Sequence, residues 1–257
     1  MEDLEACTEA SGHHLIVWFH DESTFYANDR RKERWIHESE RAIPLPKGEG
    51  ASLMVADFVS ADHGWLCSPD GTESAQVLFK AGKARDGYFT NEEIIMQVAN
   101  AMDILEKYFS DEDHIFVFNN ATTHLKRADD ALCARKMPKG PSATWGVSVK
   151  VKTSHGNAAV GPDGKPIKEK IQMMDAQLPN GDTQSLYFPD EHEKAGWFKG
   201  TAQILVKQGY SNAPGLQAEC CDFKCPKDRN DYCCRRLLYS QPDFVHVESN
   251  LETSCRM

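Results

Sequence analysis

Two stretches of sequence decide the fold: HLIVWFHDES at residues 14–23 and HIFVFNNATTH at residues 114–124. Each begins with a short apolar run, typical of a buried strand, and then changes abruptly to polar residues. Asp21 follows the first run and Asn119 follows the second. Because functional side chains of α/β sheets gather where strands end, Asp21 and Asn119 are candidate site residues.

A helix is predicted between these two stretches. Thr90 is a suitable N-cap, and Glu93 stands three residues further on, which is the spacing of a capping box. Apolar residues then recur at helical spacing, at Ile94, Ile95, Val98, Met102, Leu105 and Phe109. Further strands are predicted at residues 51–60 and 75–79. Since a strand, a helix and a strand usually form a parallel pair, the predicted fold class is α/β.

The two polar clusters also resemble motifs of a known family. The stretch VWFHDES at 17–23 and the stretch HIFVFNNATTHLK at 114–126 are similar to those of DDE superfamily endonucleases, the transposases of the Tc1/mariner/pogo kind, and more narrowly to transposon-derived proteins of fungi. A weaker similarity covers CCRRLLYSQPDF at 233–244. The resemblance implies an RNase H-like fold, which is a mixed sheet with flanking helices. It also implies DNA cleavage and strand transfer that depend on Mg²⁺ or Mn²⁺. It also implies transposon-end or target DNA as partner, a homo-oligomer and a nuclear location.

The family has three metal-binding acids, and this sequence departs from that pattern. Asp21 matches the first catalytic and metal-binding position, whereas Asn119 stands where the family has its second Asp. An Asn oxygen can ligate a metal, but it is neutral and therefore attracts a divalent cation less strongly. Nothing resembling the third motif, P-K-x-H-x-E-L-N, occurs before Met257. We therefore expect a chain truncated before the third acid and weakly active or inactive as an enzyme.

Other polar residues near the two motifs are assigned supporting roles. His20, Asn120 and His124 are expected to position the site through hydrogen bonds rather than to bind the metal directly. Glu22 alternates to the face opposite Asp21 if the strand continues. Asp57, Asp129 and Asp130 are interpreted as solvated or capping acids.

The chain is expected to have four parts. An acidic tail spans residues 1–13, and the first part of the RNase H-like core spans 14–139. A Lys- and Gly-rich insertion of hairpins and loops spans 140–190. Residues 191–257 form a helical and Cys-rich part, with helices expected at 191–210 and from 242 onward.

Five cysteines lie within fifteen residues, at Cys220, Cys221, Cys225, Cys233 and Cys234. Zn²⁺ binds four thiolate or imidazole ligands tetrahedrally. The spacing is not that of a standard zinc ribbon, and adjacent cysteines rarely bind one ion. A structural zinc site would use Cys221, Cys225, Cys233 and either Cys220 or Cys234. The alternative is a loop of reduced, partly buried thiols.

The chain carries 29 Lys and Arg against 39 Asp and Glu, a formal charge of -10. Residues 121–170 nevertheless hold ten basic and four acidic residues, a local excess of six positive charges. Phosphate contacts are predicted there. The residues proposed for them are Lys126, Arg127, Arg135, Lys136, Lys150 and Lys152. A solvated loop is the alternative interpretation.

Composition and sequence pattern exclude several classes of protein. With 40% hydrophobic and 26% charged residues, wholesale disorder is excluded. No apolar run approaches the length of a membrane span, and the acidic start lacks the features of a secretory signal, so an intracellular location is expected. Two alternatives to a transposase-type nuclease remain open: a relic that binds nucleic acid or a partner, and a zinc-stapled structural module.

Overall fold

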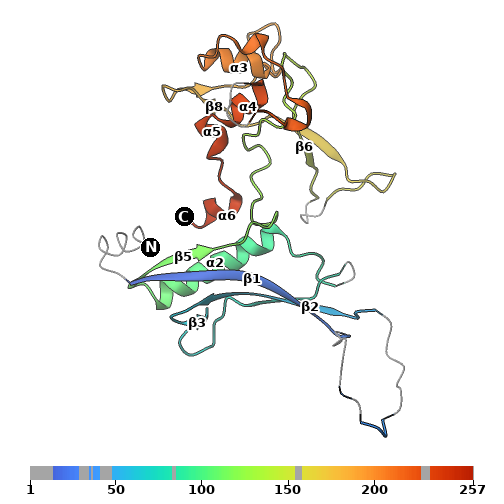
Figure 1. The fold of residues 1–257 in the computed structure, drawn as a ribbon, viewed down its shortest axis with the longest axis vertical. Coiled ribbons are helices and arrows are strands. Elements are labelled where there is room, and N and C mark those ends of the chain that lie inside the picture. The colour runs from blue at the N-terminus through green and yellow to red at the C-terminus, as the bar shows by residue number, and fades with distance from the viewer. Residues whose placement is uncertain are drawn as a thin grey trace. The chain divides into compact units, whose positions relative to one another are not determined.

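The computed structural model describes residues 14–28, 35, 37–40, 48–82, 85–153, 158–226 and 232–256. The predicted acidic tail at 1–13 lies outside the described residues. The chain divides into two compact units, here called unit 1 and unit 2. Unit 1 comprises Met1–Lys126 and Ser249–Met257, and unit 2 comprises Arg127–Glu248 (Figure 1).

A five-stranded mixed sheet forms the framework of unit 1. Its strands are β1 (His14–Tyr26), β2 (Ser52–Ser60), β3 (Gly64–Trp65), β4 (Val77–Phe79) and β5 (Glu112–Val117). The main order is β3-β2-β1-β5, and β4 also pairs with β2. β1 runs antiparallel to β2 and parallel to β5, which confirms the predicted α/β class with a mixed sheet.

β1 is longer than the sequence pattern predicts. The apolar run indicated a strand that stops at His20 and Asp21, but the strand continues to Tyr26. The reason is β2, which pairs with β1 from Phe19 to Tyr26 and satisfies its backbone even where the side chains are polar and exposed. The parallel pairing with β5 covers only His14 to Phe19.

The predicted helix is confirmed as α2 (Asn91–Tyr108), which connects the β4 and β5 regions. Thr90 caps it, and the Glu93 carboxylate accepts the Thr90 backbone N–H at 2.7 Å, so the expected capping box is present. α2 lies along one face of the sheet (Figure 1). Its Ile94 and Val98 share a core with Trp18 and Phe58. This core faces the even-numbered side chains of β1 and β2.

One polar side chain is buried at the centre of this interface. The Gln97 amide on α2 donates hydrogen bonds to the carbonyls of Ala56, at 3.0 Å, and Ala75, at 2.9 Å. Its oxygen faces His20 Nε2 at 3.1 Å. Because the amide nitrogen is committed to the two carbonyls, the His20 ring donates to the oxygen. Gln97 therefore fixes the position of α2 against β2 and against the segment before β4, and it orients His20.

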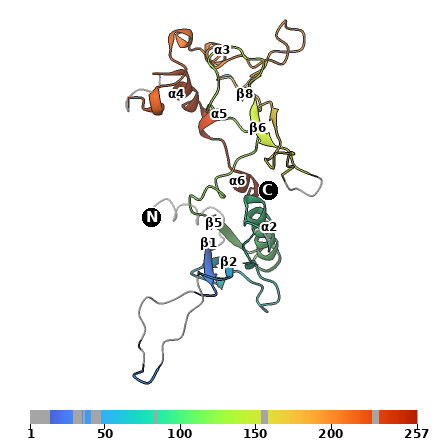
Figure 2. The same cartoon turned by 90° about the vertical axis from the view of Figure 1, so that its right-hand side faces the viewer.

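A short helix from the end of the chain also belongs to unit 1. α6 (Asn250–Ser254) has a capping box formed by Ser249 and Glu252, and Leu251 packs into the core beneath α2. Figure 2 shows α6 beside α2. The predicted helix from 242 onward is thus two separate short helices, α5 (Pro242–Val245) in unit 2 and α6 in unit 1, since Ser249 starts a new cap.

Unit 2 is built from two hairpins and several short helices. β6 (Val147–Lys150) pairs with β7 (Lys168–Ile171), and β8 (Ala176–Gln177) pairs with β9 (Thr183–Gln184), so hairpins occur where they were predicted. The helices are α3 (Thr201–Lys207), α4 (Cys234–Tyr239) and α5, with 3₁₀ turns η1 (Ala213–Gly215) and η2 (Cys221–Phe223). Leu186, Phe198, Leu205 and Leu238 are among the core residues.

The helix predicted at 191–210 is shorter than expected. α3 begins only at Thr201, after Gly200. Gly200 has φ of 92°, and an added Cβ there would lie 2.5 Å from the Lys139 carbonyl oxygen. Only glycine fits such a position, and its non-helical backbone ends any helix that approaches from residue 191. Among the described residues, no helix is long and apolar enough to cross a membrane.

The Gln97 interface yields a stability prediction. Gln97→Leu keeps the volume but leaves two buried carbonyls and the His20 ring without their partner, so unit 1 should lose about 2–4 kcal/mol of unfolding free energy. Urea unfolding measures the loss. The matched control is Met96→Ala on the neighbouring, solvent-facing position, where Met96 is 64% exposed. A loss no larger than that of the control would contradict the role given to Gln97.

Candidate functional site

The candidate site forms where β5 leaves the sheet and β1 continues. The parallel register ends at the pair Phe19 and Val117. Asp21 stands two residues beyond this point on β1, and Asn119 stands two residues beyond it on the departing chain. Their side chains meet: Asn119 Nδ2 lies 3.5 Å from Asp21 Oδ1, and both residues are exposed. The structure thus brings together the two site residues selected from the sequence.

The orientation of the Asn119 amide is set by the turn that follows it. Its Oδ1 accepts the backbone N–H of Ala121 at 3.0 Å. The amide nitrogen is therefore the atom that faces Asp21. A donor in this position partly neutralises the Asp21 carboxylate, whereas an Asp would add a second negative charge.

A second acid lies across the sheet from Asp21. Asp57 on β2 is the direct Cα partner of Asp21 in the antiparallel ladder, so both belong to the sheet face away from α2. Asp57 is buried and accepts hydrogen bonds from Gln76 Nε2, at 2.9 Å, and from the Phe58 backbone, at 2.8 Å. Burial raises the pKa of the Asp57 carboxyl above its ordinary value, although these hydrogen bonds oppose the shift.

Sequence reasoning named Asp57 but did not place it beside Asp21. The signal was available in the alternation of β2, since Val55, Asp57 and Val59 share one face. The register that aligns Asp57 with Asp21 is set by the connection between the strands, and residue types do not reveal it.

The opposite face of β1 carries a polar cluster beneath α2. His20, Glu22 and His124 each offer one ligand atom, and these atoms lie within 4.8 Å of one another. The His124 ring faces the Asn119 carbonyl oxygen through Nδ1, at 3.0 Å, and Glu22 Oε1 through Nε2, at 3.2 Å. His124 therefore holds the turn after β5 in place, as expected for a positioning residue. The prediction that Glu22 lies on the face opposite Asp21 is also consistent with this geometry.

Burial affects the protonation of His20, one of the three members of this cluster. His20 is 4% exposed. The centroid of its ring lies 4.8 Å from that of Phe58 and 5.1 Å from that of Phe118. Desolvation lowers the pKa of His20 below its ordinary value, against the hydrogen bond to Gln97 and the charge of Glu22. A neutral His20 next to Phe side chains serves the packing of the strand end better than a charged one.

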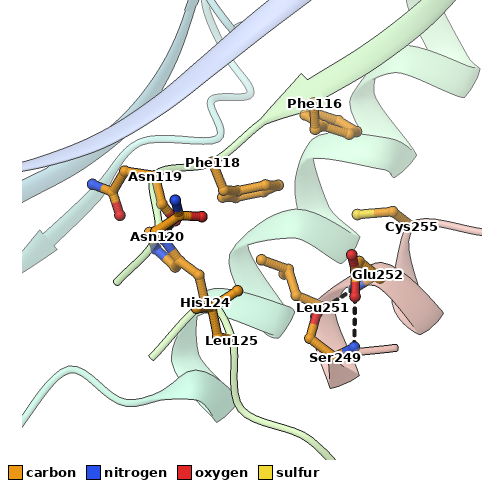
Figure 3. A pocket seen from close by; sticks show the side chains of 10 residues that line it. All are labelled: Phe116, Phe118, Asn119, Asn120, His124, Leu125, Ser249, Leu251, Glu252 and Cys255. Carbon is orange, nitrogen blue, oxygen red and sulfur yellow. Dashed lines mark hydrogen bonds between the residues drawn. The ribbon is translucent and has the colours of Figure 1, made fainter. Parts of the chain in front are cut away.

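A pocket in unit 1 extends from this site to α6 (Figure 3). Asn119, Asn120 and His124 line one part, and Ser249 and Glu252 line another. Glu252 accepts the Ser249 backbone N–H at 2.6 Å, so its carboxylate is engaged in the helix cap. Sequence reasoning placed no acid from the end of the chain near Asn119.

The residues at this edge suit a two-metal site poorly. Asp21 supplies a free-facing carboxylate, Asp57 adds nearby negative charge, and Asn119 supplies only a neutral amide. Mg²⁺ and Mn²⁺ prefer carboxylate oxygens, and two-metal chemistry needs several anionic ligands that converge. The described residues at this edge therefore offer one exposed carboxylate, that of Asp21, to a cation.

The predicted phosphate-binding residues are distributed over both units. Lys126 in unit 1 pairs with Glu92 at 3.1 Å. Arg127, Arg135 and Lys136 lie exposed in unit 2. Lys150 lies on β6 directly opposite Lys168 on β7, and Lys152 follows that strand.

The predicted zinc ligands are only partly brought together. Cys220, Cys225 and Cys233 converge, with their sulfur atoms within 4.8 Å of one another. Cys221 is exposed on η2, and Cys234 is buried with its sulfur 3.6 Å from the Ala213 carbonyl oxygen. Of the two choices left open for the fourth ligand, Cys220 belongs to the cluster. Cys221 and Cys234 are not among its members.

Comparison with known proteins gives matches to solved structures alone. No family model and no curated protein matches the chain. Parts of it are similar to the Mos1 strand transfer complex, with 18% identity and a TM-score of 0.31. They are also similar to the Mos1 transposase paired-end complex with left transposon end, with 19% identity and a TM-score of 0.33, and to the Mos1 mariner paired end complex with Mn, with 18% identity and a TM-score of 0.33.

These matches cover 49% of this chain and 34–35% of the Mos1 chains. The chain therefore spans about a third of the length of those proteins. The matched structures are of the same mariner kind as the family that the two sequence motifs resemble. Because identity and TM-scores at this level do not transfer an activity, the assignment of function rests on the geometry of the described residues.

The facing of Asn119 and Asp21 predicts a change in metal affinity. Asn119→Asp replaces the neutral donor by a carboxylate, so the affinity for Mn²⁺ should rise roughly tenfold, about 1.4 kcal/mol. Isothermal titration of Mn²⁺ into the reduced protein measures it. Asp21→Asn in the Asn119→Asp background should return the affinity to the original level. An unchanged affinity in Asn119→Asp would show that this edge of the sheet is not a cation site.

Proposed function

We propose that unit 1 is an RNase H-like domain of the DDE transposase kind, which binds a divalent cation and a DNA phosphodiester at the Asp21 edge and cleaves DNA weakly or not at all. The observation that carries this proposal is the end of the β1–β5 register. It leaves Asp21 and Asn119, the residues of the two family-like motifs, in contact at an exposed edge. The matches to Mos1 complexes are compatible with it but add no residue-level support.

Charge explains why binding is favoured over cleavage. Cleavage between two metal ions needs an anionic ligand that bridges them and further acids that complete both coordination shells. Among the described residues of this edge, Asp21 is the exposed acid, and Asn119 turns a donor toward it. Both Asp57 oxygens already accept hydrogen bonds. A single cation held by Asp21 would need fewer anionic ligands and could still attract a DNA phosphate.

Partners and location follow from the same proposal. The ancestral chemistry would be Mg²⁺- or Mn²⁺-dependent cleavage and strand transfer at transposon ends or target DNA. A nuclear location and assembly into a homo-oligomer are proposed together with that ancestral chemistry. The whole-protein activity and its partners are part of the proposal, because the chain spans about a third of the Mos1 chains that it matches.

The proposed function predicts Mn²⁺-dependent DNA binding without efficient nicking. In fluorescence anisotropy with a short labelled duplex, Mn²⁺ should strengthen binding severalfold relative to EDTA, because the cation neutralises charge between Asp21 and the phosphate. Asp21→Ala should remove this gain. The matched control is Asp62→Ala, an exposed acid in a turn of the same unit, which should keep it.

Incubation with supercoiled plasmid and Mn²⁺ completes the test. The unsubstituted protein should nick no more than Asp21→Ala does. Robust nicking that disappears in Asp21→Ala would show that the chain is an active nuclease. A duplex affinity that does not change with Mn²⁺ would show that no cation at Asp21 contributes to DNA binding.

A second candidate function is nucleic-acid binding by unit 2, and a feature of the β6–β7 hairpin favours it. Lys150 and Lys168 are direct cross-strand partners, and Lys170 lies on the same face opposite Ser148. All three side chains are on exposed residues. Like charges directly opposite each other destabilise a hairpin, and a polyanionic partner would offset this repulsion.

The hairpin predicts a salt-dependent DNA affinity. Lys150→Glu combined with Lys168→Glu should weaken duplex binding and reduce the slope of log affinity against log salt by about 2, since each phosphate contact contributes about 0.9. Anisotropy titrations over a salt series measure the slope. The control is Lys80→Glu together with Lys194→Glu, which changes the net charge by the same amount at positions outside the β6–β7 hairpin. Equal slopes for both pairs would show that the hairpin does not contact phosphate.

A further inference from the structure

The Cys-rich segment of unit 2 folds so that distant cysteines meet. The backbone N–H groups of Cys234 and Arg235 bond to the carbonyls of Gln217, at 2.9 Å, and Ala218, at 3.1 Å. These bonds hold the start of α4 alongside residues 217–218, just before Cys220. The α4 N-cap is Cys233, so its sulfur is held at a fixed helix end.

A tight turn returns Cys225 to the same place. The η2 turn closes with a bond from the Phe223 N–H to the Cys220 carbonyl at 2.9 Å. Asp222 and Phe223 have φ of 53° and 57°, a left-handed conformation that non-glycine residues rarely adopt. Residues in such a conformation cost of order 1 kcal/mol each and persist where the surroundings require them. Here they reverse the chain between Cys220 and Cys225.

The three sulfur atoms lie close enough together to bind one metal ion. Cys225 Sγ lies 3.1 Å from Cys220 Sγ and 3.7 Å from Cys233 Sγ. In a tetrahedral site with Zn–S bonds near 2.3 Å, sulfur atoms stand about 3.8 Å apart. Cys220 and Cys233 are buried and Cys225 is half-buried, so the cluster is shielded on most sides. None of the described cysteines is in a disulfide.

Donor and cationic groups lie beside two of the three sulfur atoms. The Arg236 backbone N–H donates to Cys233 Sγ at 3.4 Å. Desolvation acts against the charge on Cys225, but hydrogen bonds from Cys220 and Arg236 outweigh it and lower its pKa. Burial and the neighbouring sulfurs raise the pKa of Cys220 to about 12.

We propose that Cys220, Cys225 and Cys233 bind one Zn²⁺ ion that fixes the Cys-rich segment onto the core of unit 2. The thiols that still carry protons release them to solvent as three Zn–S bonds form, which leaves a thiolate complex with one net negative charge. The Arg236 side chain offsets this charge.

The position of the cluster indicates what the zinc stabilises. Cys234, Leu237 and Leu238 of α4 pack into the main core of unit 2, and α4 has only six residues. Short isolated helices are unstable in water, so α4 depends on an anchor at its start. Zn²⁺ at the N-cap residue Cys233 supplies that anchor. The proposal concerns unit 2 alone and does not depend on the cation proposed at Asp21.

Metal content tests the proposal directly. Full-length protein purified under reducing conditions should hold about one zinc ion per chain by mass spectrometry of the metal. Cys225→Ser should hold roughly tenfold less. Cys221→Ser is the matched control, since Cys221 is an adjacent, exposed cysteine on the same turn and outside the cluster. Zinc well below one ion per chain in the reduced protein, or equal zinc in both variants, would overturn the proposal.

A second readout covers the case in which Cys225→Ser does not fold. Co²⁺ added to the metal-depleted, unsubstituted protein should give the absorption of a tetrahedral thiolate complex, and Zn²⁺ should displace it. EDTA should lower the melting temperature of the unsubstituted protein and of Cys221→Ser alike. Absence of the cobalt spectrum would overturn the proposal. So would a Cys220–Cys225 disulfide, detected by mass as the loss of two hydrogens in protein kept under reducing conditions.

Discussion

The parallel pairing of β1 with β5 is the constraint on which the site in unit 1 depends. Its register begins at His14 with Glu112 and ends at Phe19 with Val117. Beyond that pair the described backbone pairing of β1 is with β2, and the chain after β5 leaves the ladder but still contacts β1 through side chains. Asp21 and Asn119 face each other because each stands two residues beyond the last pair. A register shift of one residue would send one of the two side chains to the opposite face.

The core beneath α2 maintains this register. Trp18 and Phe58 are fully buried against α2, and Gln97 connects the helix to the backbone of β2 and to His20. His124 continues the connection to the carbonyl of Asn119. The polar residues near the motifs therefore act mainly on position, and the charge available for a cation comes from Asp21, with Asp57 behind it. The proposed cation at Asp21 would attract a phosphate with fewer anionic ligands than two-metal cleavage needs.

Much of unit 1 could be predicted because its signals are local. The apolar runs at 14–19 and 115–118 and the capping box at Thr90 each reside in a few adjacent residues, and the structure has the corresponding strands and helix. The continuation of β1 to Tyr26 was missed because pairing with β2, not side-chain pattern, keeps it extended. The alignment of Asp57 with Asp21 was missed for a related reason, since register is a property of two strands together.

Unit 2 was harder to predict because distant residues determine its structure. The hairpins were expected from short alternating segments, but α3 is shortened by Gly200, whose close contact with Lys139 no local pattern reveals. Among the cysteines, spacing alone did not choose between Cys220 and Cys234. The bonds from the start of α4 to Gln217 and Ala218 place Cys233 toward Cys220, while Cys234 turns into the core.

The central claim is that a divalent cation binds at the edge formed by Asp21 and Asn119. Paramagnetic broadening of the backbone amide signals of labelled protein by substoichiometric Mn²⁺ tests it most directly, because broadening falls steeply with distance from the ion. The account predicts that the signals of residues 20–22 and 118–120 weaken first, and that they keep their intensity in Asp21→Ala. Broadening that centres on another part of the chain, or that is unchanged in Asp21→Ala, would contradict it.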